Sequence, residues 1–212
     1  MRKNPKPALI TVLTLLTLTA SYLLISSYPT FASSPTVPEQ EDTAVEAGRI
    51  IFEETAGGVS CAVCHGHFAL GDVGTGPYIR GVSEQTIREA LDTVADMDFL
   101  SLTDDEIQGV AAYLDWLGGL EARKTNFKRG EFIPAELHVP AGKEVQLIIV
   151  NSDRSDRSFG SPELGLDEFK VAARGFSDLL WTTPTEEGTY FLRCIECGGQ
   201  LPLLVIHIDA GE

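Results

Sequence analysis

One short segment of the chain, Cys61-Ala-Val-Cys64-His65, combines residue types and a spacing that can do chemistry. The pattern C-x-x-C-H is typical of covalent haem attachment, because each of the two thiols can add across one vinyl group of the porphyrin. The adjoining His65 is then placed to give the iron an imidazole nitrogen as its proximal ligand. A CxxC without this histidine would leave disulfide, zinc and thiol-redox interpretations open. The motif therefore predicts one haem c, bound covalently through Cys61 and Cys64.

A single methionine is the candidate for the second axial ligand of that iron. The chain has two methionines, and because Met1 is the initiator, Met97 is the remaining thioether; it lies 32 residues after His65 and between two aspartates. A lone methionine often only fills a core, but flanking charges argue against a plain core position. His67 is the rival ligand, although it lies too close to His65 to reach the opposite face of a haem. We expect Met97 to be the distal ligand, which raises the reduction potential and favours electron transfer.

The residues around this motif are expected to be helical. Ser83 can cap a helix that carries Ile87, Ala90 and Leu91 on one side. The segment Thr103-Asp-Asp-Glu106 is a capping box. The helix that it opens is expected to end at Gly118-Gly119. Residues 43–122 are therefore predicted to form a small all-α domain.

Residues 43–122 resemble a class I c-type cytochrome over their full length. The matching stretches are Gly48-Arg-Ile-Ile-Phe52, Cys61-Ala-Val-Cys64-His65-Gly66, Gly74-Thr-Gly-Pro77 and Leu102-Thr-Asp-Asp-Glu-Ile107, which leads to Tyr113. The resemblance implies a helical bundle around one haem, in which Gly48 and Phe52 cross against Tyr113 or Trp116. It also implies that the carbonyl group of Pro77 accepts the proximal His65 N–H and so fixes the imidazole ring.

The chain changes its periodicity after residue 122, with a domain boundary expected near residues 120–126. Short strands punctuated by Gly, Pro, Asn and Asp predict an all-β sandwich over residues 123–212. The expected strands are Glu131–Val139, Glu144–Asn151, Leu179–Thr183, Tyr190–Cys194 and Leu203–Ile208.

Residues 127–209 resemble a cupredoxin with a Greek-key sandwich, most closely the copper-binding domain of cytochrome c oxidase subunit II. The resemblance rests on Phe132-Ile-Pro134, Val139-Pro-Ala-Gly142, Val150-Asn151, Ser158-Phe159, Pro162-Glu-Leu-Gly-Leu166, Gly188-Thr-Tyr190 and Cys194-Ile-Glu196-Cys197-Gly198. That family holds two copper ions with two Cys, two His, a Met and a backbone carbonyl. In this chain, Arg157, Leu201 and Leu204 stand where the family has its His, His and Met ligands.

We therefore expect no dinuclear copper centre, because two thiolates without imidazoles do not provide its ligand set. Three alternatives are open for Cys194 and Cys197: a disulfide, which an oxidising compartment favours and which we place first; buried thiols; or another metal site with Glu196 and one of His138 or His207. In each of them the copper site is vestigial.

The charge of the chain is strongly acidic, with 16 Lys and Arg against 31 Asp and Glu and a net charge of −15. Nucleic acid is therefore not an expected partner. Residues 43–122 carry three basic and fourteen acidic side chains, against ten and fourteen in residues 123–212. The negative electrostatic field of residues 43–122 can steer this domain towards a positively charged partner, or the acidic surface can only keep the protein soluble. Both interpretations are open.

The N-terminus has the features of a targeting segment. Arg2, Lys3 and Lys6 precede an uncharged run over residues 8–25. We favour an uncleaved transmembrane anchor over residues 1–26 because of the length of this run, with cleavage after Ala32 as the alternative. Residues 27–42 are rich in Ser, Pro and Thr and are predicted to be a flexible linker. The positive end stays in the cytoplasm, which places the domains on the periplasmic or outer side of a bacterial cytoplasmic membrane.

Together these features predict a membrane-anchored cytochrome that transfers single electrons and is not catalytic alone. The resemblance implies a respiratory subunit-II-like component of a haem–copper oxidase or nitric oxide reductase type complex, with integral-membrane oxidoreductase subunits as redox partners. The known relatives usually place the cytochrome after the copper domain, whereas here it comes first. A self-standing periplasmic carrier and a haem or thiol redox enzyme or sensor are the alternatives.

Overall fold

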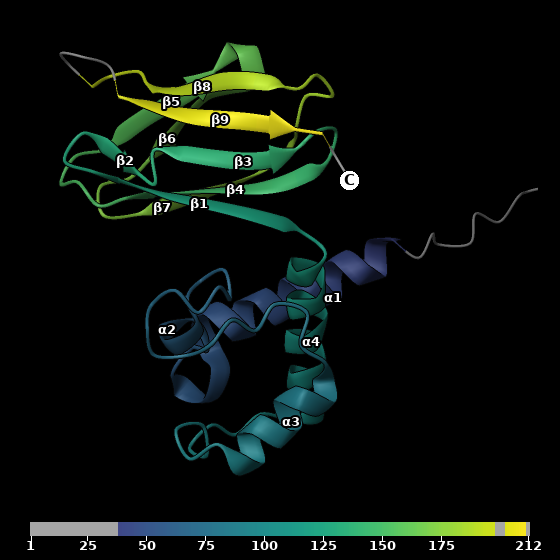
Figure 1. The fold of residues 1–212 in the computed structure, drawn as a ribbon. Helices are drawn as coiled ribbons and strands as arrows, with labels where there is room; N and C mark the ends of the chain where they lie inside the picture. Colours follow the sequence, from purple (N-terminus) through teal and green to yellow (C-terminus); the bar gives the residue numbers. More distant parts are fainter. Residues whose placement is uncertain (1–37, 198–201, 211–212) are drawn as a thin grey trace, which may run out of the picture. The chain divides into compact units, whose positions relative to one another are not determined.

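The computed structural model describes residues 38–197 and 202–210 (Figure 1). The predicted anchor over residues 1–26 and most of the predicted linker lie outside these residues, as does Leu201. Within the described ranges, no helix is both long and apolar enough to cross a membrane. The fold consists of a helical part followed by a β part.

The helical part begins earlier than the sequence predicts, because the first helix already includes the last five residues of the expected linker. Pro38 stands at its first position, where proline is well tolerated since its missing N–H has no helical partner to lose. The elements are α1 (Pro38–Ile50), a π-helical turn η1 (Ile51–Thr55), a 3-10 turn η2 (Ala56–Gly58), α2 (Ala62–His65), α3 (Glu84–Thr93) and α4 (Asp104–Gly118).

Both predicted helix caps are confirmed. The Ser83 hydroxyl oxygen accepts the backbone N–H of Thr86 over 3.2 Å at the start of α3. At the start of α4, the Thr103 N–H donates to the Glu106 carboxylate over 2.7 Å, and the Glu106 N–H donates to the Thr103 hydroxyl over 3.3 Å. The Thr103 backbone and hydroxyl groups thereby lower the pKa of Glu106 from its ordinary value. These caps satisfy N–H groups that the first turn of a helix leaves without partners.

Helices α1 and α4 cross at a pair of glycines (Figure 1). A Cβ atom on Gly48 would lie 1.9 Å from the carbonyl oxygen of Gly109. Next to this crossing, the buried rings of Phe52 and Tyr113 pack with their centroids 5.6 Å apart. The crossing that the resemblance implies for Gly48, Phe52 and Tyr113 is therefore present. It joins the two ends of the helical part around one apolar core.

Gly48→Ala should lower the free energy of unfolding by about 1–3 kcal/mol, the usual range for overpacking a core. The gain in helix propensity, at most about 1 kcal/mol, is smaller than this penalty because the obstacle is backbone that no rotamer change can move. Thermal unfolding followed by far-UV circular dichroism measures the effect. Gly119→Ala is the matched control, since its Cβ would meet nothing closer than 3.5 Å and its φ is −75°. Equal unfolding temperatures for the two variants would contradict the close approach.

The β part is a sandwich of two sheets. The strand order is β2-β1-β4-β7 in the four-stranded sheet and β3-β9-β8-β5-β6 in the five-stranded sheet. Neighbouring strands are antiparallel, except that β1 pairs with β4 and β3 pairs with β9 in parallel. The strands are β1 (Glu121–Lys128), β2 (Glu131–Ile133), β3 (Glu136–Pro140), β4 (Glu144–Asn151), β5 (Arg157–Ser161), β6 (Leu166–Val171), β7 (Phe176–Thr182), β8 (Gly188–Cys194) and β9 (Leu203–Asp209).

Three of these strands, β1, β5 and β6, were not predicted, and the strand predicted over residues 131–139 was wrong as a single element. It divides at Pro134 into β2 and β3, which join different sheets. Proline lacks the N–H that a continuous strand would donate. The change from helix to strand falls between Gly118 and Glu121.

The core of the sandwich lies between the sheets, and residues alternate between the core and the outer face along each strand. In β9, Leu204, Ile206 and Ile208 are buried in this core. His207 lies between two of them and is therefore on the outer face of the five-stranded sheet. This alternation decides which side chains of the β part can meet.

Candidate functional site

The C-x-x-C-H segment folds as one short helical turn. His65 N–H donates to the carbonyl of Cys61 over 3.0 Å, and Gly66 ends the turn with a φ of +78°, a left-handed conformation that favours glycine. Residues three apart on a helical turn lie on the same side, so both cysteines face one side of the segment. Cys61 is half-buried, Cys64 is exposed, and both are free thiols in this structure.

The imidazole of His65 is held in one orientation and one tautomer. Its Nδ1 lies 2.9 Å from the carbonyl oxygen of Pro77, and the residue is 8 % exposed. Because a carbonyl can only accept, Nδ1 carries the hydrogen and Nε2 keeps its lone pair. The loop that carries Pro77 passes so close to the His65 ring that position 76 requires glycine, because a Cβ atom there would lie 2.7 Å from His65 Nδ1. The contact that the resemblance implies for Pro77 is therefore present, and it leaves Nε2 available to a metal.

An apolar cavity of about 250 Å³ opens beside His65. Its walls come from the turn after α1, the C-x-x-C-H segment, the loop before α3, and the helices α3 and α4. The lining residues are Phe52, Cys61, His65, Pro77, Ile79, Val82, Thr86, Ile87, Ala90, Val94, Met97, Val110 and Leu114. Four of these, Thr86, Ile87, Ala90 and Val94, belong to α3 or directly follow it, so this helix forms one wall of the cavity.

Met97 lies in the loop that follows α3 and lines the same cavity as His65. It also lines a small adjoining cavity of about 40 Å³ together with Cys61, Cys64 and His65. The structure thus brings together four predicted haem-site residues that the sequence separates by up to 36 positions. His67 is exposed and, among the residues that the structure describes, is not part of either cavity lining.

The surroundings of this site are apolar. Burial raises the pKa of the Cys61 thiol to about 11, so this group is an uncharged thiol at neutral pH. An imidazole nitrogen and a thioether sulfur are axial ligands of haem iron in electron-transfer proteins. The cavity, its two thiols and this pair of donors fit a haem group. The roles of Cys61, Cys64, His65, Met97 and Pro77 toward haem stay predictions.

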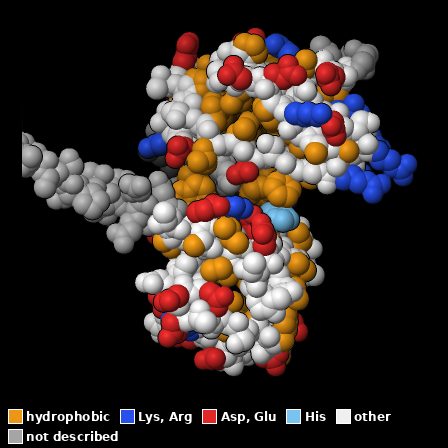
Figure 2. Space-filling view, turned by 180° about the vertical axis from the view of Figure 1, so that it is seen from behind, with side chains coloured by type: hydrophobic (Ala, Val, Ile, Leu, Met, Phe, Trp, Pro, Cys, Tyr) orange, Lys and Arg blue, Asp and Glu red, His pale blue; other side chains and the backbone are white. Residues whose placement is uncertain are grey.

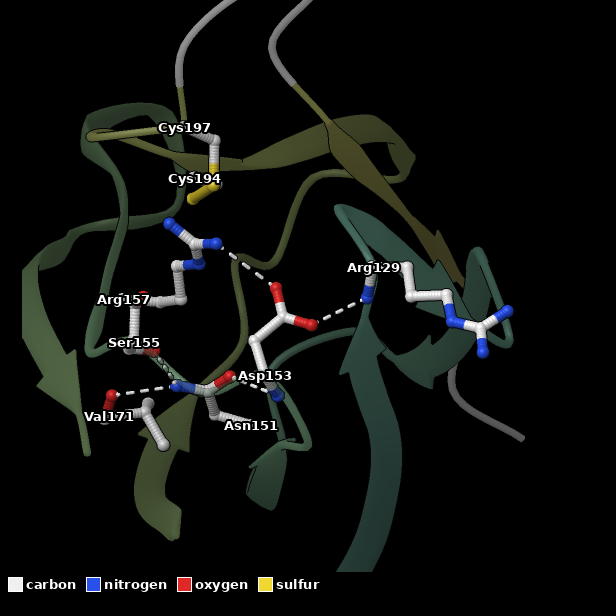
Figure 3. Close-up of a disulfide and its surroundings, with 8 residues drawn as sticks. All are labelled: Arg129, Asn151, Asp153, Ser155, Arg157, Val171, Cys194 and Cys197. Atoms are coloured by element: carbon white, nitrogen blue, oxygen red, sulfur yellow. Dashed lines mark hydrogen bonds and ion pairs between the residues drawn. A yellow bond between two sulfur atoms is a disulfide. The ribbon is translucent and has the colours of Figure 1, made fainter. Parts of the chain in front are cut away.

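A second candidate site lies at one end of the sandwich, where Cys194 and Cys197 are joined by a disulfide (Figure 3). Cys194 is fully buried and Cys197 is 8 % exposed. Among the three alternatives for this pair, the disulfide is the one that the structure contains. The alternative that joins the pair to His207 fails geometrically, because Cys194 lies in the core between the sheets and His207 lies on the outer face.

Arg157, which stands where the resemblance places the first histidine ligand of copper, extends its guanidinium towards this disulfide (Figure 3). It donates to the Asp153 carboxylate over 3.1 Å and lies 5.9 Å from the ring centroid of Phe127. Burial acts to raise the pKa of Asp153, but hydrogen bonds from the Arg129 backbone N–H and Arg157 outweigh it, so the pKa lies below its ordinary value. A fixed cation therefore occupies the neighbourhood of the two sulfur atoms, and it disfavours a copper ion there.

The loop that carries Asp153 is itself held by Asn151. The Asn151 side-chain amide donates to the carbonyl oxygens of Ser155 and Val171 over 2.9 and 3.1 Å (Figure 3). The Asn151 side-chain oxygen accepts the Asp153 N–H over 3.1 Å. Buried amides with all their partners satisfied rigidify the backbone around them. The ion pair of Asp153 with Arg157 thus rests on a fixed loop.

Sequence reasoning missed several residues of these sites. Gly76, Thr86 and Val94 belong to the haem-site candidate, and only the helical period of α3 gave a signal for the latter two. Outside these two sites, sequence reasoning also missed that His138 and His207 are direct partners across the neighbouring strands β3 and β9. Each of these histidines alone looks like one residue of a strand, and no local pattern shows that β3 and β9 are neighbours.

The comparisons with known proteins concern the β part. A family model described as a cupredoxin-like domain matches residues 121–197. No curated protein matches the chain.

Several solved structures are similar to less than half of the chain, all at low sequence identity. A haem–copper terminal oxidase is 13% identical, with a TM-score of 0.36, over 43% of this chain and 66% of the oxidase chain. The blue copper protein auracyanin A from Chloroflexus aurantiacus is 17% identical, with a TM-score of 0.37, over 43% of this chain and all of its own. A third match is the structure of a mixed disulfide between a thioredoxin-like protein and subunit II of cytochrome c oxidase. It is 14% identical, with a TM-score of 0.35, over 42% of this chain and 82% of the matched chain.

The family match begins at the first residue of β1 and ends at the second cysteine of the disulfide. It therefore covers the sandwich up to the loop before β9. Its two packed sheets have the layered all-β architecture that the sequence predicts. The C-terminal part of this chain is therefore an all-β sandwich that matches the model of a cupredoxin-like domain over residues 121–197.

Proposed function

We propose that this protein is an exported, membrane-anchored mono-haem c-type cytochrome that transfers single electrons between redox proteins. The observation that carries the proposal is the convergence of Cys61, His65 and Met97 on one apolar cavity. Motif, ligand pair and cavity are three requirements of such a site, and His65 takes part in all of them.

Each predicted residue of the site would have a separate role in holding the haem. Cys61 and Cys64 would hold the haem covalently, and the free Nε2 of His65 would bind its iron. Pro77 keeps the His65 ring from rotating, because its carbonyl oxygen holds Nδ1–H. Met97, which lines the same cavity, would supply a second ligand to the iron, and the apolar walls would exclude water. When bound, haem supplies a reversible one-electron couple.

The cupredoxin-like domain supports an electron-transfer context, with the haem as the site of transfer. The further proposal that the protein is a subunit-II-like component of a haem–copper oxidase or nitric oxide reductase type complex rests on the motifs of residues 127–209. The Cys194-Ile-Glu196-Cys197 loop is the most specific of them. In this proposal the domain contacts integral-membrane partner subunits and carries no dinuclear copper.

Metal analysis of the purified full-length protein should give one iron and no stoichiometric copper per chain after dialysis against EDTA. The reason is that Cys61, His65 and Met97 offer a haem site, whereas Arg157 replaces a copper ligand. Plasma emission spectrometry and the pyridine haemochrome spectrum measure metal and haem on the same sample. Two copper ions per chain that survive chelation would overturn the proposal for the β domain, and a chain without iron would overturn the cytochrome proposal.

Isolation from membranes in mild detergent distinguishes a subunit from a self-standing carrier. Integral-membrane oxidoreductase subunits that co-purify with the tagged full chain, identified by mass spectrometry, support the subunit proposal. A single monodisperse haem protein would instead make it a carrier. Carbon monoxide binding to the reduced native protein would favour an enzyme or sensor, because it requires an open axial position.

A further inference from the structure

The outer face of the five-stranded sheet brings two histidines together. In the parallel pair β3–β9, His138 and His207 are direct partners across the strands. Their rings stack with centroids 4.6 Å apart and planes inclined by 21°. The side chains are 64 % and 29 % exposed, so both rings are accessible from solution. This pair lies on the face opposite the core that contains the disulfide and has no part in the function proposed above.

Each ring is oriented through its Nδ1 atom. His138 Nδ1 lies 2.8 Å from the Asp209 carboxylate, and since a carboxylate accepts, Nδ1 carries the hydrogen and Nε2 keeps a lone pair. His207 Nδ1 lies 3.3 Å from the hydroxyl of Thr189, which can accept the same kind of hydrogen bond. A carboxylate behind the imidazole is the arrangement that fixes metal-binding histidines and makes them more basic.

A second carboxylate, that of Glu136, lies near the Nε2 atom of His207. Glu136 Oε2 lies 3.7 Å from His207 Nε2. Bonds from a transition-metal ion to imidazole nitrogen or carboxylate oxygen are about 2.0–2.2 Å long, so two atoms at this separation can share one ion that lies beside the line joining them. Glu136 and Asp209 supply two negative charges that offset those of a divalent cation.

We propose that His138, His207 and Glu136 form a binding site for a divalent transition-metal ion on the outer face of β3 and β9. Within residues 38–197 and 202–210, no group of three or more His, Cys, Asp or Glu side chains is already placed to hold a metal ion. The exposed His138 side chain would therefore move to bring in its Nε2 while its Nδ1 stays hydrogen-bonded to Asp209, and water would complete the coordination. Imidazole ligands suit copper, nickel and zinc, and Cu(II) binds most tightly in this series.

Isothermal titration of the oxidised, EDTA-treated full-length holoprotein with Cu(II), and separately with Zn(II), tests the site. The wild type should bind one ion, with Cu(II) tighter than Zn(II). His138→Gln and His207→Gln should each weaken binding at least 10-fold, and Asp209→Asn should weaken it about 10–100-fold by releasing the His138 ring. His67→Gln is the matched control, since it removes an exposed imidazole from another part of the chain and should leave the affinity unchanged.

The outcomes separate this site from the haem. Equal Cu(II) binding by the wild type and His207→Gln would overturn the proposal, and so would an equal loss of affinity in His67→Gln. The haem content of each variant, measured by pyridine haemochrome, should stay at the wild-type value, because no ligand of the proposed site lines the haem cavity. A wild type that lacks haem but binds Cu(II) through these histidines would refute the cytochrome and keep the metal site.

Discussion

The double variant Cys61→Ala/Cys64→Ala should be exported without any covalently attached haem. The two thiols are the sole means of covalent attachment in the proposed site, and His65 and Met97 alone hold haem only by coordination. Denaturing electrophoresis with haem staining, together with intact-protein mass spectrometry, should show complete loss of the haem signal and mass. The single variants should retain at most one thioether bond and a reduced yield.

Cys194→Ala/Cys197→Ala is the matched control for this experiment. It removes the same number of cysteines from the same exported chain, but from the core of the sandwich and not from the haem-site candidate. This variant should keep its haem stain, although it loses the stabilisation of the disulfide, about 2 kcal/mol for so short a loop. Haem retained by the Cys61/Cys64 variant, or lost equally by both variants, would refute covalent attachment at residues 61 and 64.

Met97→Ala should abolish the visible charge-transfer band that a Met-ligated ferric haem shows. Met97 lines the cavity beside His65, so the substitution would remove the proposed second ligand of the iron. Axial ligands set haem potentials over a range of about 0.8 V, and loss of a thioether should lower the midpoint potential by on the order of 0.1 V or more. Optical spectra and a potentiometric titration measure the two effects, and the reduced variant should also bind carbon monoxide.

Asp98→Asn provides the control for the Met97 variant. It changes a neighbouring exposed residue of the same loop that is not among the described linings of either haem-site cavity. The band and the carbon monoxide resistance of this variant should match those of the wild type. A wild-type protein that never shows the band would mean that Met97 is not the ligand.

The helical part could be predicted well from sequence because its signals are local. Thr103 and Glu106 are three residues apart and cap one turn, and Ser83 acts in the same way. Strand β1 could not be predicted: the sequence Glu-Ala-Arg-Lys-Thr-Asn-Phe-Lys has little apolar alternation. It is a strand because it pairs with β4 along seven residues, a partnership that only the folded chain reveals. Strand β5, with five residues, depends in the same way on its neighbours β6 and β8.

In the candidate sites, too, the residues that belong to a local motif could be predicted, whereas those that depend on the folded chain could not. The C-x-x-C-H motif and the sole thioether after Met1 mark Cys61, Cys64, His65 and Met97 without any structure. The need for glycine at position 76 depends on how closely the loop approaches the His65 ring, a distance that no spacing encodes. The His138–His207 pair depends on the register of two strands nearly 70 residues apart in sequence.

The ion pair of Arg157 with Asp153 has a consequence for how the protein matures. A metal centre in a protein is complete only after its ion has been delivered. Here the positive charge next to the sulfur pair is part of the polypeptide and is present as soon as the domain folds. Assembly of this domain should therefore proceed at the same rate in copper-starved and copper-replete cells, and it should not depend on any copper chaperone.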